Sequence, residues 1–95
     1  MIALITANVY DEFDNETHTH HIVREMEGNT CEEVGRYIDS VFGTDAESFK
    51  VEFIDSEAIY VNEEIFEGLR TDKYLQADLG RTVIIEYDGG SMVLP

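Results

Sequence analysis

Near the N-terminus, the even-numbered and the odd-numbered positions both carry mostly apolar side chains. Residues 2–10 follow this pattern, and residues 11–16 then carry turn-forming side chains. Because successive side chains of a strand point to opposite faces of a sheet, we expect a first strand with two apolar faces, at the centre of a sheet. Residues 17–27 resume an extended pattern, so the segment from 2 to 27 is predicted to be a β-hairpin.

A different period follows the hairpin. Thr30 and Glu33 have the spacing of a helix capping box, and Gly43 supplies a C-terminal stop. Between them, apolar residues recur at helical spacing, which predicts an amphipathic helix. These residues are Val34, Tyr37, Ile38, Val41 and Phe42.

The middle of the chain predicts a strand and a second helical region. Residues 49–53 alternate as a strand does, and Asp55-Ser56 then leads either to a short fourth strand over 58–61 or to one bent strand. Asn62 is a good N-cap for a helix. Thr71-Asp72 has the character of a second cap, so residues 63–79 are interpreted as two short helices.

The chain ends in a second predicted hairpin. Residues 82–87 alternate, Asp88-Gly89-Gly90 is a turn signal, and apolar residues 92–94 follow. The expected order is therefore β-β-α-β-(β)-α-β-β. We predict an α+β fold with a mostly antiparallel sheet and two or three short helices packed on one face.

Composition adds an unusual charge to this ordinary pattern. The chain has 21 Asp and Glu against 6 Lys and Arg in 95 residues, a formal net charge of -15, and 43% of its residues are hydrophobic. That apolar content indicates a folded chain, which we expect to form one acidic domain over residues 1–95. The N-terminus lacks the features of a signal peptide or a membrane span, so a cytoplasmic protein is expected.

The sequence offers one local candidate for metal binding. His18 and His20 alternate on a predicted strand and so share a face, close in sequence to Asp14 and Glu16. No second cluster completes a tetrahedral ligand set, and the acids of residues 11–16 lack the spacing of a calcium loop. We interpret the histidines as part of an exposed polar strand, and we expect neither a metal site nor a cofactor.

Other acids have a structural explanation. Glu32-Glu33 and Glu63-Glu64 fall in the first turns of predicted helices, where carboxylates complement the helix dipole. No catalytic motif is present, so we expect no enzymatic activity. Six scattered cations cannot form the basic patch that binding to nucleic acid requires.

A folded and strongly negative surface favours a basic protein partner. Our first hypothesis is a small acidic inhibitor that binds the basic nucleic-acid-binding surface of a nuclease or defence complex, as anti-CRISPR and anti-restriction proteins of phages or mobile elements do. An immunity protein or antitoxin that neutralises a nuclease toxin has the same profile. The alternative outside this class is a non-inhibitory acidic interaction module, or a surface made acidic for solubility in a high-salt cell.

The predicted contacts with such a partner lie in three segments. Tyr10 and Phe13 adjoin the first hairpin's tip and are candidates for an apolar anchor. The predicted partner-binding residues are Asp11, Glu12, Phe13, Asp14 and Glu16 at the tip, Glu32, Glu33 and Asp39 on the first helix, and Glu63, Glu64 and Glu67 on the second.

Overall fold

The first sheet is built on the N-terminal hairpin. The computed structural model describes residues 1–76 and 80–94. Strands β1 (Ile2–Asp11) and β2 (Glu16–Glu25) form the predicted hairpin, and β3 (Ala46–Ile54) pairs with the other edge of β1. The order is β2-β1-β3, with all pairs antiparallel, so β1 is central as its two apolar faces predicted.

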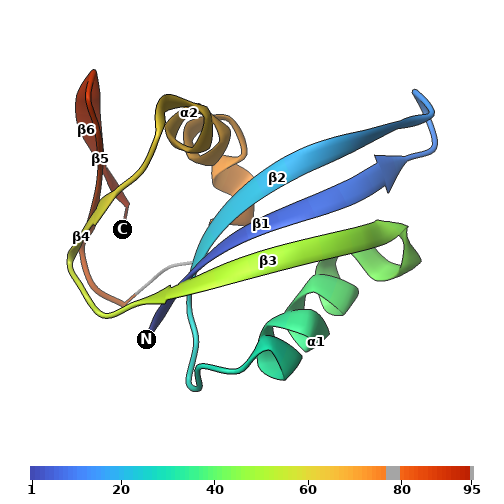
Figure 1. Cartoon of the computed structure of the whole chain (residues 1–95), viewed down its shortest axis with the longest axis horizontal. Coiled ribbons are helices and arrows are strands. Elements are labelled where there is room, and N and C mark those ends of the chain that lie inside the picture. Colours follow the sequence, from blue (N-terminus) through green and yellow to red (C-terminus); the bar gives the residue numbers. More distant parts are fainter. Residues whose placement is uncertain (77–79, 95) are drawn as a thin grey trace.

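Helix α1 (Cys31–Phe42) covers one face of this sheet (Figure 1). The Thr30 side chain accepts a hydrogen bond from the Glu33 backbone N–H, as the capping motif predicted. The Glu33 carboxylate instead accepts from the Gly28 N–H, so the box is only half formed. Val34 and Ile38 are buried against the apolar side chains of β1 and β2 that face the helix. Gly43, at φ 65°, ends the helix and begins the short 3-10 helix η1 (Gly43–Asp45).

The remaining strands form a second sheet. Strand β4 (Ala58–Tyr60) runs parallel to β5 (Val83–Tyr87), and β6 (Gly90–Leu94) pairs antiparallel with β5. Helix α2 (Glu63–Thr71) begins after Asn62, whose side chain accepts from the Ile65 N–H. A second 3-10 helix, η2 (Lys73–Leu75), follows α2. Buried residues of β1, β2, α2 and the second sheet form one continuous hydrophobic cluster.

The α+β class and the order of elements are confirmed, and the layering is more elaborate than expected. The strands divide into two three-stranded sheets, and α1 and α2 lie on opposite faces of the first sheet (Figure 1), so the prediction that the helices pack on one face is wrong. The reason lies in β1, because each of its two apolar faces needs its own cover. The predicted second short helix is η2, and residues 77–79 of that prediction lie outside the described residues.

The outer edge of β2 is covered by a side chain. The Gln76 amide donates to the backbone oxygen of His21 and accepts from the backbone N–H of Val23. It thereby occupies two of the backbone groups that a neighbouring strand would bind, which protects this part of the sheet edge. This contact holds the segment after α2 against the hairpin.

Within the described ranges, the longest helix is α1 with 12 residues, and no helix has the length and apolar character needed to cross a membrane.

Candidate partner-binding groove

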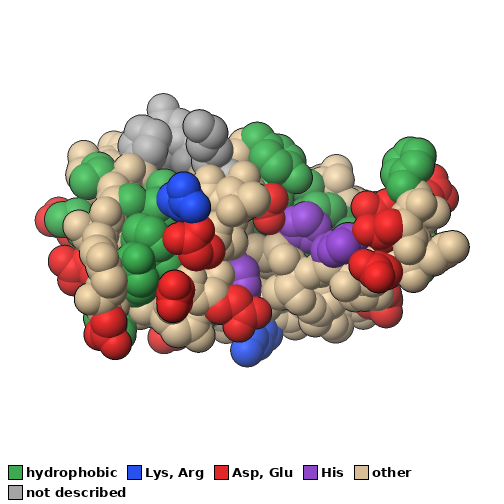
Figure 2. Space-filling model, turned by 90° about the horizontal axis from the view of Figure 1, so that it is seen from above, with side chains coloured by type: hydrophobic (Ala, Val, Ile, Leu, Met, Phe, Trp, Pro, Cys, Tyr) green, Lys and Arg blue, Asp and Glu red, His purple; other side chains and the backbone are tan. Residues whose placement is uncertain are grey.

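Acidic and aromatic side chains meet at the far end of the first hairpin. Figure 2 shows acidic side chains gathered around an exposed hydrophobic one at this end of the molecule, next to histidines. The hairpin tip contributes Phe13, whose side chain is 94% exposed, and Tyr10, which is 37% exposed. Tyr74 of η2 is 75% exposed and lines the same groove. Large aromatic side chains are therefore presented to solvent inside an acidic region.

The groove has a volume of about 330 Å³ and is open to solvent. Its acidic members are Asp11 and Glu12 from the tip and Asp45 from η1. Its walls come from three places in the sequence: the hairpin end, the end of α1 with η1, and η2. The lining residues are Val9, Tyr10, Asp11, Glu12, Phe13, His18, His20, Phe42, Asp45 and Tyr74.

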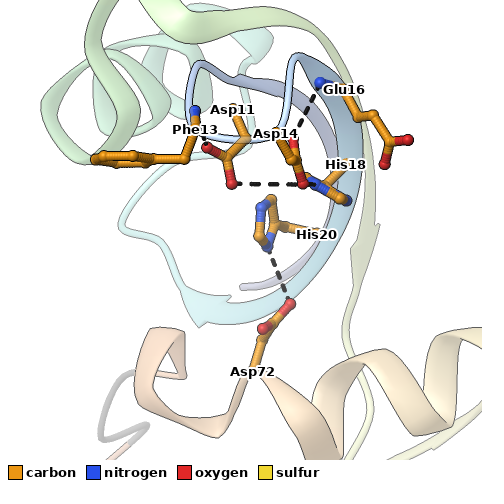
Figure 3. Close-up of polar contacts among 7 residues, drawn as sticks. All are labelled: Asp11, Phe13, Asp14, Glu16, His18, His20 and Asp72. Carbon is orange, nitrogen blue, oxygen red and sulfur yellow. Dashed lines mark hydrogen bonds and ion pairs between the residues drawn. The ribbon is translucent and has the colours of Figure 1, made fainter.

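The tip is held in shape by its own carboxylates (Figure 3). One oxygen of Asp11 accepts from the Phe13 backbone N–H at 2.9 Å, and one oxygen of Asp14 accepts from the Glu16 N–H at 2.9 Å. Asn15 adopts the left-handed conformation, with φ 56°, and its side-chain oxygen accepts from the Tyr10 hydroxyl. The second oxygens of Asp11 and Asp14 remain directed away from the turn, toward His18.

Strand register brings the two histidines into this groove. Val9 is paired with His18 and Ala7 with His20, so both imidazoles share the face of β1 that α1 covers. His18 Nε2 lies 2.5 Å from Asp14 Oδ2, and this hydrogen bond raises the pKa of His18 and lowers the pKa of Asp14. Because each shift favours the charged form, the pair is arranged as an ion pair.

His20 connects the hairpin to the other elements of the groove. Its Nδ1 lies 3.0 Å from Asp72 Oδ2, at the C-terminal end of α2, and both side chains are about one-fifth exposed. Its ring also stacks on Phe42 of α1, with 5.3 Å between the ring centroids. The floor of the groove is therefore fixed by contacts among three elements.

The predicted acids of the two helices lie on opposite sides of the first sheet. On α1, Glu32 is paired with Arg36 at 3.1 Å, Glu33 is bonded to Gly28, and Asp39 is exposed. On α2, Glu67 is paired with Arg70 at 2.6 Å, whereas Glu63 and Glu64 are exposed. A single flat partner surface cannot contact both sets, so the structure does not unite the eleven predicted residues into one site.

A second groove lies at the other end of the molecule, between α2 and the β5–β6 turn. It has a volume of about 600 Å³ and includes Glu63 from the predicted set, with Glu52 and Asp88. Tyr60, which is 65% exposed, donates its hydroxyl to Asp88, and this bond raises the pKa of Tyr60. This groove also combines acids with an aromatic ring, but it contains only one of the predicted residues.

All four arginines are engaged within the molecule. Arg36, Arg70 and Arg81 form ion pairs with glutamates of the same chain, and Arg24 lies over the ring of Tyr37. By contrast, the side chains of Glu12 and Asp45 have no hydrogen-bond or ion-pair partner among the described residues. Within the part of the chain that the structure describes, two of the three acids that line the tip groove therefore lack a charged partner.

The sequence did not indicate Phe42, Asp45, Tyr74 or Asp72 as site residues. Phe42 appeared only as part of the apolar stripe of a helix, and Asp45 and Tyr74 lie far from the hairpin in sequence. One signal was available in the sequence, because His18 and His20 alternate along β2. The register with β1 then places them on the same face as Val9, which lines the groove. The contacts from η1 and η2 depend on tertiary packing and leave no local pattern.

Comparison of the chain with protein-family models, with curated proteins and with solved structures gives no match.

Proposed function

We propose that this protein is a small acidic inhibitor that binds the basic nucleic-acid-binding surface of a nuclease or defence complex. The proposal rests on the tip groove, where acidic side chains, two of them without a partner among the described residues, adjoin exposed aromatic rings. On this proposal the protein acts by binding in the cytoplasm, as an inhibitor encoded by a phage or mobile element, and not as an enzyme. It does not bind nucleic acid itself.

The negative charge of the protein favours its encounter with a basic partner. A protein with a net charge of -15 attracts a basic cleft over distances of about 8–10 Å at moderate salt, and this attraction accelerates encounter. Duplex DNA presents one negative charge per roughly 1.7 Å of its axis. Closely spaced carboxylates on a hydrogen-bonded turn, such as Asp11, Glu12 and Asp14, offer a comparable target for lysines and arginines that normally bind phosphates.

The exposed aromatic side chains provide the apolar area that a stable complex would bury. Steering by charge gives speed and orientation, whereas a stable complex needs apolar contact area that is buried on binding. Phe13 has almost its entire side chain available for burial, and Tyr74 extends that area across the groove. Arginine side chains also stack on aromatic rings. The groove therefore supports recognition of an arginine-rich cleft better than a purely acidic surface would.

Displacement of nucleic acid tests this proposal. Fluorescent duplex DNA or RNA is bound at low salt to members of a panel of nucleases and nuclease-containing defence complexes, and the protein is titrated in. We expect displacement from at least one member, and displacement should weaken as salt rises. Poly-glutamate at equal total charge is the control for unspecific competition. Failure to displace nucleic acid from any member more effectively than poly-glutamate would contradict the proposal.

Phe13→Ala distinguishes this groove from the second one. With a partner from that panel, we expect the variant to raise the dissociation rate by about tenfold or more, the effect of removing a central aromatic contact. Tyr60→Ala, in the second groove, is the matched control and should leave the rate unchanged. The reverse pattern, measured by stopped-flow dissociation, would move the binding surface to the groove beside α2.

A further inference from the structure

We propose that the tip also binds a divalent transition metal, with Zn²⁺ as the best-suited ion, through Asp11, Asp14 and His18. One ligand atom from each of these residues lies within 4.8 Å of the others. His18 Nε2 is 2.5 Å from Asp14 Oδ2 and 4.0 Å from Asp11 Oδ2. The three side chains thus converge on one small space from a turn and from the two strands that it joins (Figure 3).

The distances suit zinc after small side-chain movements. Zn²⁺ binds imidazole nitrogen and carboxylate oxygen at about 2.0–2.2 Å, which places ligand atoms of a tetrahedral site about 3.3 Å apart. One of the two measured separations in this cluster is shorter than that value and the other is longer. Zn²⁺ would replace the hydrogen bond between His18 and Asp14, with those two ligand atoms moving apart and Asp11 moving inward.

The chemistry of the ligands selects the class of metal. Calcium and magnesium favour sites made of oxygen atoms alone, whereas a site with imidazole favours zinc, nickel, copper or cobalt. The imidazole of His18 is therefore what distinguishes this cluster from the acidic surface elsewhere on the protein. Excess acidic charge in the neighbourhood adds attraction for any cation but does not provide this selectivity.

His20 lies beside this cluster and is not one of its ligands. Figure 3 shows its ring between Asp72 on one side and the Asp11, Asp14 and His18 group on the other. Its Nδ1 lies 3.0 Å from Asp72 Oδ2, and its nitrogens are outside the set of ligand atoms that lie within 4.8 Å of one another. Three protein ligands with a water in the fourth position are an arrangement that zinc adopts in proteins.

Titration of zinc into the protein tests the site. Untagged full-length protein is freed of metal with EDTA, dialysed, and titrated with ZnCl₂ by calorimetry, with CaCl₂ as the comparison ion. We expect one zinc per chain, bound at least tenfold more tightly than calcium. Substitution of CoCl₂ should give the visible absorption of four-coordinate cobalt, which reports direct coordination rather than counter-ion attraction.

Variants separate coordination from general charge. His18→Gln and Asp14→Asn should each weaken zinc binding by about tenfold or more, because each removes one of the three protein ligands. The double variant Glu12→Gln/Glu16→Gln removes two charges from the same tip and should leave the affinity within about twofold. Thermal unfolding in EDTA verifies that each variant is folded as the wild type is.

Two results would overturn the metal site. The first is the absence of one-to-one zinc binding tighter than calcium binding in the folded wild-type protein. The second is an affinity that falls equally in His18→Gln and in the Glu12→Gln/Glu16→Gln control. Both readouts are made without any partner, so they are independent of whether the protein inhibits a nuclease.

Discussion

Replacement of Leu69 by alanine is expected to lower the free energy of unfolding by about 2–5 kcal/mol. Leu69 lies on α2, is 0% exposed, and belongs to the cluster that contains side chains of both sheets. Truncation removes the apolar contacts by which α2 joins the sheets and leaves a cavity among them. Because a domain of this size is stable by only about 5–15 kcal/mol, the variant should unfold at a much lower urea concentration.

Val93→Ala is the matched control for this experiment. Val93 lies on β6 and is 62% exposed, so its truncation should change the free energy of unfolding by less than about 0.5 kcal/mol. Both variants are measured by urea denaturation followed by circular dichroism. A Leu69→Ala variant as stable as the control would show that α2 is not part of the cooperative core.

Gly68→Ala is expected to destabilise the protein by about 1–2 kcal/mol, although alanine is the better helix former. A Cβ at position 68 would lie 2.5 Å from Cδ2 of the His21 ring. That ring cannot move freely, since it is buried and within hydrogen-bond distance of Thr6 Oγ1, at 3.2 Å. Burial also lowers the pKa of His21, which favours the neutral ring in this position.

Gly35→Ala is the control, because Gly35 is also a helix glycine that faces a side chain of the first sheet. There the added Cβ would meet Phe49 at 3.6 Å, an ordinary contact, so the variant should be stabilised by up to about 1 kcal/mol. A double-mutant cycle isolates the clash, because Gly68→Ala should no longer be destabilising when His21 is also alanine. Equal effects of the two glycine substitutions in thermal denaturation would contradict the close packing of α2 on β2.

The sequence predicted those parts of the fold that leave a local pattern. The two-residue period of residues 2–10 indicated a central strand, and the Thr30 cap with its apolar stripe indicated α1. The division into two sheets could not be predicted, because β4 is only three residues long and pairs in parallel with a strand that lies far along the chain. The 22 residues 61–82 separate β4 from β5. The contact between Gly68 and His21 likewise depends on packing between elements.

The residues of the candidate site could likewise be predicted only in part. The acids and Phe13 at the hairpin tip could be predicted, since a turn between two strands projects its side chains outward whatever the rest of the fold does. The other walls of the groove could not, because Phe42 and Tyr74 reach it through the positions of α1 and η2. The acids of α1 and α2 illustrate the opposite case, in which residues with the same predicted role lie on opposite faces of a sheet.

On our proposal, the tip groove and not net charge alone is responsible for binding to a basic partner. Two variants of equal net charge distinguish these alternatives in the nucleic-acid displacement assay, run in EDTA. The tip variant is Asp11→Asn/Glu12→Gln/Asp14→Asn, in which the asparagines retain the oxygens that accept the turn hydrogen bonds. The control is Asp55→Asn/Glu57→Gln/Glu86→Gln, at exposed positions that line neither groove.

We expect the control to displace nucleic acid nearly as well as the wild type, and the tip variant to require about tenfold more protein or higher. Equal loss in both variants would contradict a defined binding surface and would leave only unspecific attraction by the charge of -15.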